Sequence, residues 1–397
     1  MISLDQALEQ LLAQATAITQ TEAVATVDAL GRVLAQPIIS NVAVPPLDNS
    51  EMDGYAVRCA DVSLVPASLP VSQRIQAGQV GQPLTPGTAA RIFTGAPIPS
   101  GCDAIVPQEA TTVQADRVVI LSMPKPGQWI RPAGMDITSG ARVLERGTRL
   151  RPPHVGLAAS VGLARLLVYR RLRVGVLFTG DELVMPGEPL PAGRIYNSNR
   201  FTLSTLLRGL GCEVIDLGIV PDQLEATRQT LVHAAGSADL VISCGGVSVG
   251  EADHVRAAVQ AEGAIDLWQI AIKPGKPLAF GHVRGVPFIG LPGNPVSGLV
   301  TFAILARPFI LKRQGAFDLR PRAVPMRADF DVVQPGTRRE FLRVRVTAQG
   351  MLEAFAVQNS AVLTSAAWAD GLADIEIGRR VSRGSEVPYL PFSELFG

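Results

Sequence analysis

Short apolar runs alternate with helical patterns between Leu172 and Leu311, and this alternation constrains the fold more than any other feature. Because strands separated by helices of 10–15 residues are joined by right-handed crossovers, the pattern predicts a parallel sheet. A hairpin is expected through 278–289 and a helix over 296–311. The expected strands are 173–178, 213–217, 240–243 and 267–272, and the expected helices are 200–209, 223–235 and 254–261.

The remaining segments have a different character. Residues 36–148 are rich in proline and glycine with short β-type runs, which is typical of a β-rich region with many turns. After Gly315 the pattern is again β-like, with runs at 328–333, 340–346 and 353–357, and predicts a small C-terminal β domain. Ser3 and Gln6 form a capping-box pattern that begins an N-terminal helix. A chain of 397 residues predicts two to four domains.

Composition excludes several classes of protein. The net charge of +1 gives no global attraction to nucleic acid or to an anionic membrane, so an anion site has to be local. The N-terminus lacks the basic and apolar regions of a secretory signal, and the longest apolar run, 296–306, ends at Arg307 and is too short to span a bilayer. The four cysteines are scattered, which predicts reduced thiols in a cytoplasmic protein and no zinc site: Cys59, Cys102, Cys212 and Cys244.

Only four lysines occur in the chain, and Lys273 and Lys276 both lie in the segment IKPGKPLAF. The loops FTGDE (178–182) and SCGGVSVGEADH (243–254) precede it, and each of these three segments begins where a predicted strand stops. Ligands of parallel sheets bind at the carboxyl ends of strands. Lysine charges, glycine N–H groups and carboxylates together predict a site for a phosphorylated or oxyanionic substrate.

Three carboxylates could bind Mg²⁺ at this edge of the sheet: Glu182, Asp222 and Asp253. Asp222 and Asp253 each have a simpler explanation as helix N-caps. Gly245, Gly246 and Gly250 could bring N–H groups to a phosphate, although the pattern is neither G-x-G-x-x-G nor a Walker A loop and such glycines are often only turns.

The other candidates are open to similar alternatives. The two lysines could belong to a solvated turn, and the Pro292–Pro295 loop could be a helix start or a ligand wall. No Ser/His/Asp or Cys/His constellation is visible, so we expect catalysis to be electrostatic and metal-assisted.

With these motifs, the chain resembles the molybdopterin molybdenumtransferase family of the bacterial MoeA and gephyrin E-domain type. The resemblance covers essentially the whole chain, and the motifs that carry it are PPLDNSEMDGYAV (45–57), RIFTGAPIPSGCDAIVPQE (91–109), IRPAGMDI (130–137), FTGDEL, IYNSNR (195–200), SCGGVSVGEADH, IKPGKPLAF and GLPGNPVS (290–297). The resemblance implies a three-layer α/β/α molybdopterin-binding domain with a mostly parallel sheet, β-rich domains and a C-terminal domain like a β-barrel.

The implied reaction inserts molybdate into adenylyl-molybdopterin with release of AMP and depends on Mg²⁺. The resemblance assigns Glu182, Asp222 and Asp253 to the metal or the phosphates. Catalytic roles are implied for Glu182, Asp53, Thr94 and Lys273. Residues implied to bind the substrates, with Arg343 and Ser360 at the molybdate, are Gly245, Gly246, Ser248, Gly250, Lys273, Lys276, Pro292, Pro295, Arg131, Asp136, Arg343 and Ser360.

The implied architecture is an elongated homodimer of four-domain subunits, in which the β-rich domain of one subunit reaches the cleft of its partner. The upstream molybdopterin adenylyltransferase is an expected partner. The four domains would comprise 21–40 with 141–171 (domain I), 41–140 (domain II), 1–20 with 172–316 (domain III) and 317–397 (domain IV).

Two departures from the family pattern are present. Gln269 stands where a basic residue is usual, and the segment 364–372 around Trp368 is atypical. Two other functions stay open: a molybdopterin adenylyltransferase, whose fold resembles the α/β domain alone, and a non-catalytic scaffold or cofactor carrier. The sequence does not discriminate molybdate from tungstate or Mg²⁺ from Mn²⁺.

Overall fold

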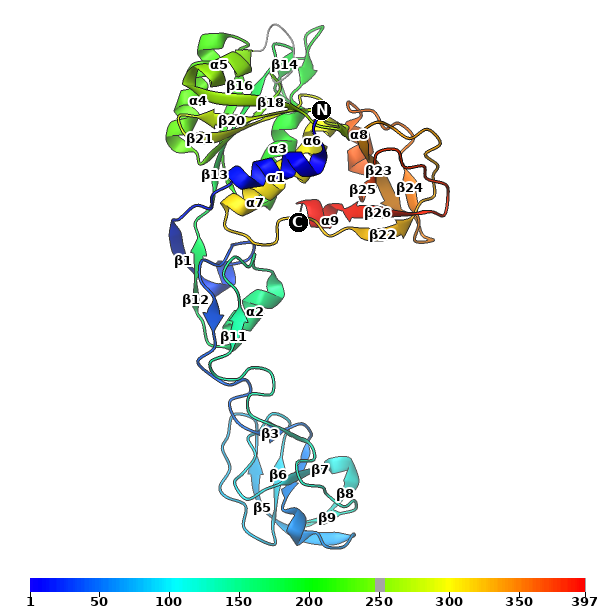
Figure 1. Cartoon of the computed structure of the whole chain (residues 1–397). Coiled ribbons are helices and arrows are strands. Elements are labelled where there is room, and N and C mark those ends of the chain that lie inside the picture. The colour runs from blue at the N-terminus through cyan, green and yellow to red at the C-terminus, as the bar shows by residue number, and fades with distance from the viewer. Residues whose placement is uncertain (247–253, 397) are drawn as a thin grey trace.

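The chain is elongated, with an α/β domain and a C-terminal domain at one end and a distal β domain at the other (Figure 1). The computed structural model describes residues 1–246 and 254–396. A narrow connecting domain lies between the two ends, so the distal domain is well separated from the α/β domain (Figure 1).

The α/β domain is built on a six-stranded sheet. Strand β13 pairs in parallel with β16 and β17, and β17 pairs in parallel with β21. Strand β20 is antiparallel to both β21 and β18, so the hairpin is added to a parallel core. The predicted, mostly parallel sheet is confirmed. In sheet order the strands are β16 (Glu213–Val220), β13 (Arg173–Thr179), β17 (Leu240–Cys244), β21 (Val286–Leu291), β20 (Pro277–Val283) and β18 (Gly263–Gln269).

Helices cover both faces of this sheet and give three layers (Figure 1). Helices α4 (Leu224–Ser237) and α5 (His254–Glu262) bury apolar side chains against one face. On the other face lie α1 (Leu4–Gln14), with the predicted capping box at Ser3, and α3 (Ser198–Gly209). The N-terminal helix thus packs on the α/β core from the far end of the sequence.

The same face carries one continuous helix over 295–313, composed of α6 (Pro295–Thr301), a π-helical turn η4 (Phe302–Ala306) and α7 (Arg307–Arg313). Its 19 residues are long and apolar enough to cross a membrane, which corrects the prediction that the apolar run ends too early at Arg307. Because 89% of its most apolar window is buried inside the protein, the helix belongs to the core.

The connecting domain is formed by two segments distant in sequence. Strand β1 (Thr21–Ala25) pairs antiparallel with β12 (Arg165–Tyr169), and β2 (Ile38–Ile39) pairs with β11 (Arg142–Leu144) beside helix α2 (Pro152–Ser160). A 3₁₀ turn, η1 (Thr26–Asp28), follows β1.

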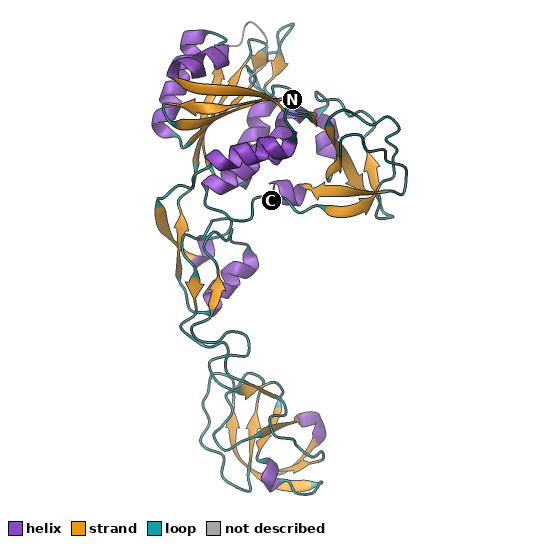
Figure 2. Ribbon diagram, in the orientation of Figure 1, coloured by secondary structure: helices purple, strands orange, loops and turns teal. Residues whose placement is uncertain are grey.

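The regular structure of the distal domain is mostly short strands, joined by extended loops (Figure 2), and includes two 3₁₀ turns. Its six-stranded sheet confirms the predicted β-rich region. In sheet order the strands are β7 (Ala104–Pro107), β4 (Gly54–Val57), β6 (Ala89–Ile92), β5 (Ala67–Ile75), β9 (Arg117–Ile120) and β8 (Thr111–Gln114), with β3 (Asn49–Ser50) paired to β10 (Ile130–Arg131) and turns η2 (Cys59–Asp61) and η3 (Gln108–Ala110).

The C-terminal domain contains a curved sheet that borrows β19 (Ile272–Lys273) from the α/β domain. The expected strand at 340–346 is present as β23. The expected strand at 328–333 is wrong, because the residues that pair are 324–327. The expected strand at 353–357 is shorter and spans 352–354. The elements are β22 (Val324–Arg327), β23 (Arg339–Val346), β24 (Leu352–Ala354), α8 (Leu363–Trp368), β25 (Gly371–Ile375), β26 (Glu386–Pro391) and α9 (Phe392–Phe396).

Candidate functional site

A cleft of about 660 Å³ opens at the carboxyl edge of the parallel strands. The strands β13, β17 and β21 end at Thr179, Cys244 and Leu291, and the loop after each of them lines the cleft. Parallel strands place their carboxyl ends at one edge of the sheet, so three loops distant in sequence converge there. Pro292 and Pro295, both predicted from the sequence, are among the lining residues.

Glycines allow these loops to approach one another closely. Gly245 has φ +96°, and a Cβ there would lie 2.8 Å from the Thr179 carbonyl oxygen. Gly180 has φ +143°, and a Cβ there would lie 2.6 Å from the Glu182 carboxylate, which folds back against the backbone. Glycine at these positions therefore lets the loops after β13 and β17 pack closely together at the cleft.

Two of the three predicted carboxylates, Glu182 and Asp222, line this cleft. The explanation of Asp222 as an N-cap is wrong: α4 begins at Leu224 with Gln223 as its N-cap, and no side chain caps it. Asp222 lies in the turn before that cap and contributes to the cleft wall instead. The third carboxylate, Asp253, lies outside the described residues, as do Ser248 and Gly250.

The oxygen donors present suit Mg²⁺, which takes one or two carboxylates together with phosphate oxygens and water. Besides Glu182 and Asp222, the Thr179 hydroxyl lines the cleft and has no hydrogen-bond partner among the described residues. Within the described chain no group of three His, Cys, Asp or Glu side chains forms a metal cage, so a bound substrate would have to complete the coordination.

Two asparagines of the IYNSNR motif contribute to the cleft, although the sequence analysis assigned them no role. The Asn197 side chain is almost fully buried, its Oδ1 accepts a hydrogen bond from Arg200 N (3.1 Å), and its Nδ2 has no partner in the described part of the chain. Asn199 Nδ2 donates to the Gly293 carbonyl oxygen at 2.6 Å and ties α3 to the loop after β21. The sequence did contain a signal for Asn197, because asparagine is a preferred N-cap residue and the motif directly precedes a predicted helix.

Cys244 also faces the cleft, but its chemistry is inert. Burial raises the pKa of its thiol to about 12, so the group stays protonated at neutral pH. Its Sγ contacts the Pro292 carbonyl oxygen at 3.5 Å.

The lysine loop lies beside the cleft, but neither ammonium group lines it. Lys273 Nζ forms an ion pair with Glu340 Oε1 of the C-terminal domain (3.2 Å), and Lys276 is exposed. A Cβ on Gly275 would collide with Thr301 Oγ1 on the long helix, so the loop packs directly against that helix. Pro277, which ends the loop, lines the cleft and pairs with Gln269 across the sheet.

The C-terminal domain also borders the cleft. The carbonyl oxygen of Ser360 accepts a hydrogen bond from Val296 N at the start of the long helix (2.9 Å), and Ala361 lines the cleft. Arg343 is buried inside the domain: its Nε donates to Ser365 Oγ (3.2 Å), while its Nη2 has no partner among the described residues. Burial lowers the pKa of Arg343 to about 10, which still leaves it charged at neutral pH.

The predicted residues of the distal domain lie far from the cleft of their own chain (Figure 1). Thr94 donates two hydrogen bonds to Asp53 Oδ1, from its N–H and its hydroxyl (2.8 Å each), and these bonds hold the pKa of Asp53 below its ordinary value. Arg131 forms an ion pair with Glu51 (3.6 Å), and Asp136 is exposed. One chain alone does not bring these residues to the cleft.

Comparison with known proteins covers almost the whole chain. Three family models match: the MoeA N-terminal region (domain I and II) at residues 2–162, a model described as "Probable molybdopterin binding domain" at 175–312, and the MoeA C-terminal region (domain IV) at 325–392. The cleft loops lie in the second of these segments.

Curated relatives and solved structures indicate the same family as the three family models. A molybdopterin molybdenumtransferase of Haemophilus influenzae is 44% identical over the full length of both chains, and one of Nostoc is 41% identical over 81% of this chain and 76% of the relative. The crystal structure of a molybdopterin biosynthesis MoeA protein from Pyrococcus horikoshii superposes with a TM-score of 0.85 at 29% identity, covering 98% of this chain and all of that one. The chain belongs to the MoeA family.

Proposed function

We propose that this protein is a molybdopterin molybdenumtransferase, which inserts molybdate into adenylyl-molybdopterin and releases AMP in a Mg²⁺-dependent reaction. The observation that carries the proposal is the cleft: three strand-end loops bring glycines and two carboxylates to one edge of the sheet. Relatives that bear this name match over the whole chain. The enzyme therefore acts in the biosynthesis of the molybdenum cofactor.

Each wall of the cleft has a distinct task in this reaction. The Gly245 N–H already donates to the Leu291 carbonyl oxygen (3.1 Å), so after β17 the Gly246 N–H would bind a substrate phosphate. Asn197 Nδ2, which is buried with no partner among the described residues, would donate to an oxyanion. Glu182 and Asp222 would hold Mg²⁺, which supplies positive charge where AMP leaves. Lys273 and Lys276, which lie beside the cleft, would bind the substrate phosphates. Arg343 and Ser360 would bind the molybdate.

We propose that the protein is a homodimer in which the partner subunit completes the cleft. Asp53 and Thr94 are held together by two hydrogen bonds, but the connecting domain keeps them away from their own cleft. The elongated shape would allow the distal domain of one protomer to reach the cleft of the other. A cytoplasmic location and association with the enzyme that supplies adenylyl-molybdopterin accompany this proposal.

The test follows AMP release from adenylyl-molybdopterin with and without molybdate over a range of Mg²⁺ concentrations. Glu182→Gln and Asp222→Asn should each raise the Mg²⁺ concentration for half-maximal rate about tenfold or more, because a lost charged ligand costs roughly 1.5–3 kcal/mol. Glu225→Gln is the matched control, since Glu225 lies on α4, does not line the cleft and bonds to Arg228 and Gln229 within the described part of the chain.

Two results would contradict the proposal. Wild-type Mg²⁺ dependence in both carboxylate variants would remove the metal from this cleft. Efficient adenylylation of molybdopterin from ATP, without turnover of the adenylylated substrate, would make the protein an adenylyltransferase instead.

A further inference from the structure

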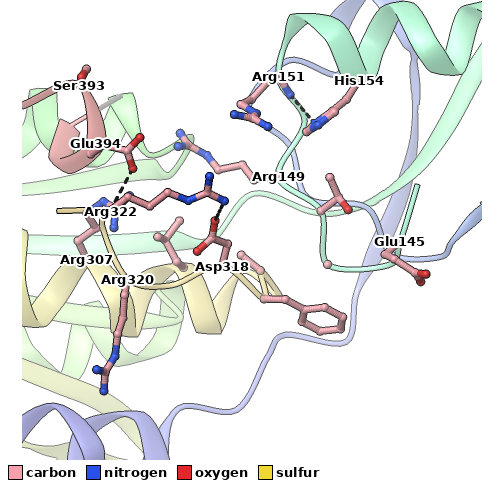
Figure 3. A pocket seen from close by; sticks show the side chains of 15 residues that line it. Glu145, Arg149, Arg151, His154, Arg307, Asp318, Arg320, Arg322, Ser393 and Glu394 are labelled. Carbon is pink, nitrogen blue, oxygen red and sulfur yellow. Dashed lines mark hydrogen bonds and ion pairs between the residues drawn. The ribbon is translucent and has the colours of Figure 1, made fainter. Parts of the chain in front are cut away.

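A second cavity, here called the junction pocket, lies where the connecting, α/β and C-terminal domains meet, and it shares no lining residue with the cleft (Figure 3). Its volume is about 460 Å³. The lining comes from three stretches: 145–154 of the connecting domain, 307–322 at the end of the long helix and after it, and 393–394 in α9.

The lining of the junction pocket carries a net positive charge. Five arginines line the junction pocket against three carboxylates and one histidine. Arg149 and Arg322 extend into the space between the three stretches, whereas Arg320 points away from them (Figure 3). These groups are Arg149, Arg151, Arg307, Arg320 and Arg322, with Glu145, Asp318, Glu394 and His154.

Arg307 is the unusual member because it is only 7% exposed and begins α7 within an otherwise apolar helix. Its Nη1 donates to the Leu319 carbonyl oxygen at 3.2 Å, while its Nε has no hydrogen-bond partner among the described residues. Burial, reinforced by the nearby charge of Arg149, lowers the pKa of Arg307 to about 10, so it is still a cation at neutral pH. A buried cation with an unpaired donor is costly for a fold to keep.

The carboxylates of the pocket do not neutralise this charge. Asp318 pairs with Arg322 at 3.6 Å, but both side chains are more than three-quarters exposed, so the contact is weak. Glu394 accepts a long hydrogen bond from Arg322 N (3.4 Å). The charges of Glu394 and Asp318 favour the protonated form of Arg307 without a hydrogen bond to it among the described residues. His154 Nδ1 accepts a hydrogen bond from Arg151 N (3.2 Å).

We propose that the junction pocket binds a tetrahedral dianionic oxyanion, either free phosphate or the phosphoryl group of a nucleotide. Guanidinium groups match this chemistry because their paired N–H donors bind two oxygens of one anion. The Arg307 Nε donor supplies a contact that no described residue satisfies. Since the ligand would touch three domains, binding would also brace their junction.

The test measures heat of binding to the full-length protein for orthophosphate, AMP and adenosine. Arg320→Ala with Arg322→Ala, both exposed positions, should weaken binding of the anions about tenfold or more, since each lost charge-assisted contact is strong. Arg307→Met should abolish binding, and its melting profile shows whether it folds. Whichever of phosphate and AMP binds more tightly identifies the source of the oxyanion.

Two controls locate the binding site. Arg327→Ala removes an exposed arginine of β22 that does not line the pocket and should bind like the wild type. Lys276→Ala should weaken only binding at the cleft, so the heat that persists in this variant and is lost in the double arginine variant belongs to the junction pocket. The proposal is overturned if neither anion binds at millimolar concentration, if adenosine binds as well as AMP, or if the double arginine variant binds normally.

Discussion

Replacing Lys273 by alanine separates two roles that the structure allows for this lysine. Its ammonium group lies 3.2 Å from Glu340 Oε1, across the boundary between the α/β and C-terminal domains, and its side chain is 46% exposed. An ion pair this exposed stabilises a protein by at most about 1 kcal/mol. If that pair is the only role, Lys273→Ala should lower stability slightly and leave catalysis unchanged.

A lysine that contacts a substrate phosphate has a larger effect. Loss of one charge-assisted contact costs roughly 1.5–3 kcal/mol, which corresponds to a decrease in kcat/KM of roughly 10- to 150-fold. We expect this larger effect, because the loop that carries Lys273 packs on the long helix and ends at Pro277 in the cleft wall.

Glu340→Gln is the matched variant, since it breaks the same ion pair and leaves the ammonium group free. The assay is the rate of AMP release together with the midpoint of chemical unfolding for both variants, compared only as midpoints because a multidomain chain need not unfold in two states. We expect equal small shifts in midpoint, but loss of kcat/KM only in Lys273→Ala. Wild-type kcat/KM in both variants would refute the role in substrate binding.

Two further predictions concern the acid stability of the chain and its assembly. Burial alone would raise the pKa of Asp239, but hydrogen bonds from Arg170 (2.7 Å) and Arg173 N (2.8 Å) outweigh it and hold the pKa below its ordinary value. This stabilisation is present at pH values above the ordinary pKa and is lost as the pH falls through the lowered pKa. Asp239→Asn should therefore reduce the stability of the fold by about 2–4 kcal/mol at neutral pH and by progressively less in acid. Unfolding measured at several pH values tests this. If the distal domain completes the partner's cleft, inactive Asp53→Asn and Glu182→Gln chains should form mixed dimers with one intact cleft, and mixed dimers as inactive as their parents would exclude such sharing.

The α/β domain could be predicted from the sequence because its periodicity is strong and its strands are buried. The C-terminal domain could not be predicted as well, since its strands are short and its contacts are distant in sequence. Helix α8 illustrates the reason: Trp368 packs edge-on against Phe355 at 5.2 Å and under the Arg345 guanidinium at 4.5 Å. These contacts join the helix to residues outside 364–372, so the local sequence of that segment did not reveal them.

The same distinction explains which site residues could be grouped in advance. Loops that follow parallel strands must meet at one edge of the sheet, so the positions of Glu182 and Gly245 after strands β13 and β17 were sufficient to bring them together. The Pro292 loop after β21, which the sequence left open as a helix start or a ligand wall, also lines the cleft. No comparable rule relates residues on different domains. Ser360 lies beside the cleft, where its carbonyl oxygen accepts one backbone hydrogen bond from Val296, and Asp53 is distant from the cleft of its own chain. Their grouping therefore depends on contacts that strand order cannot encode.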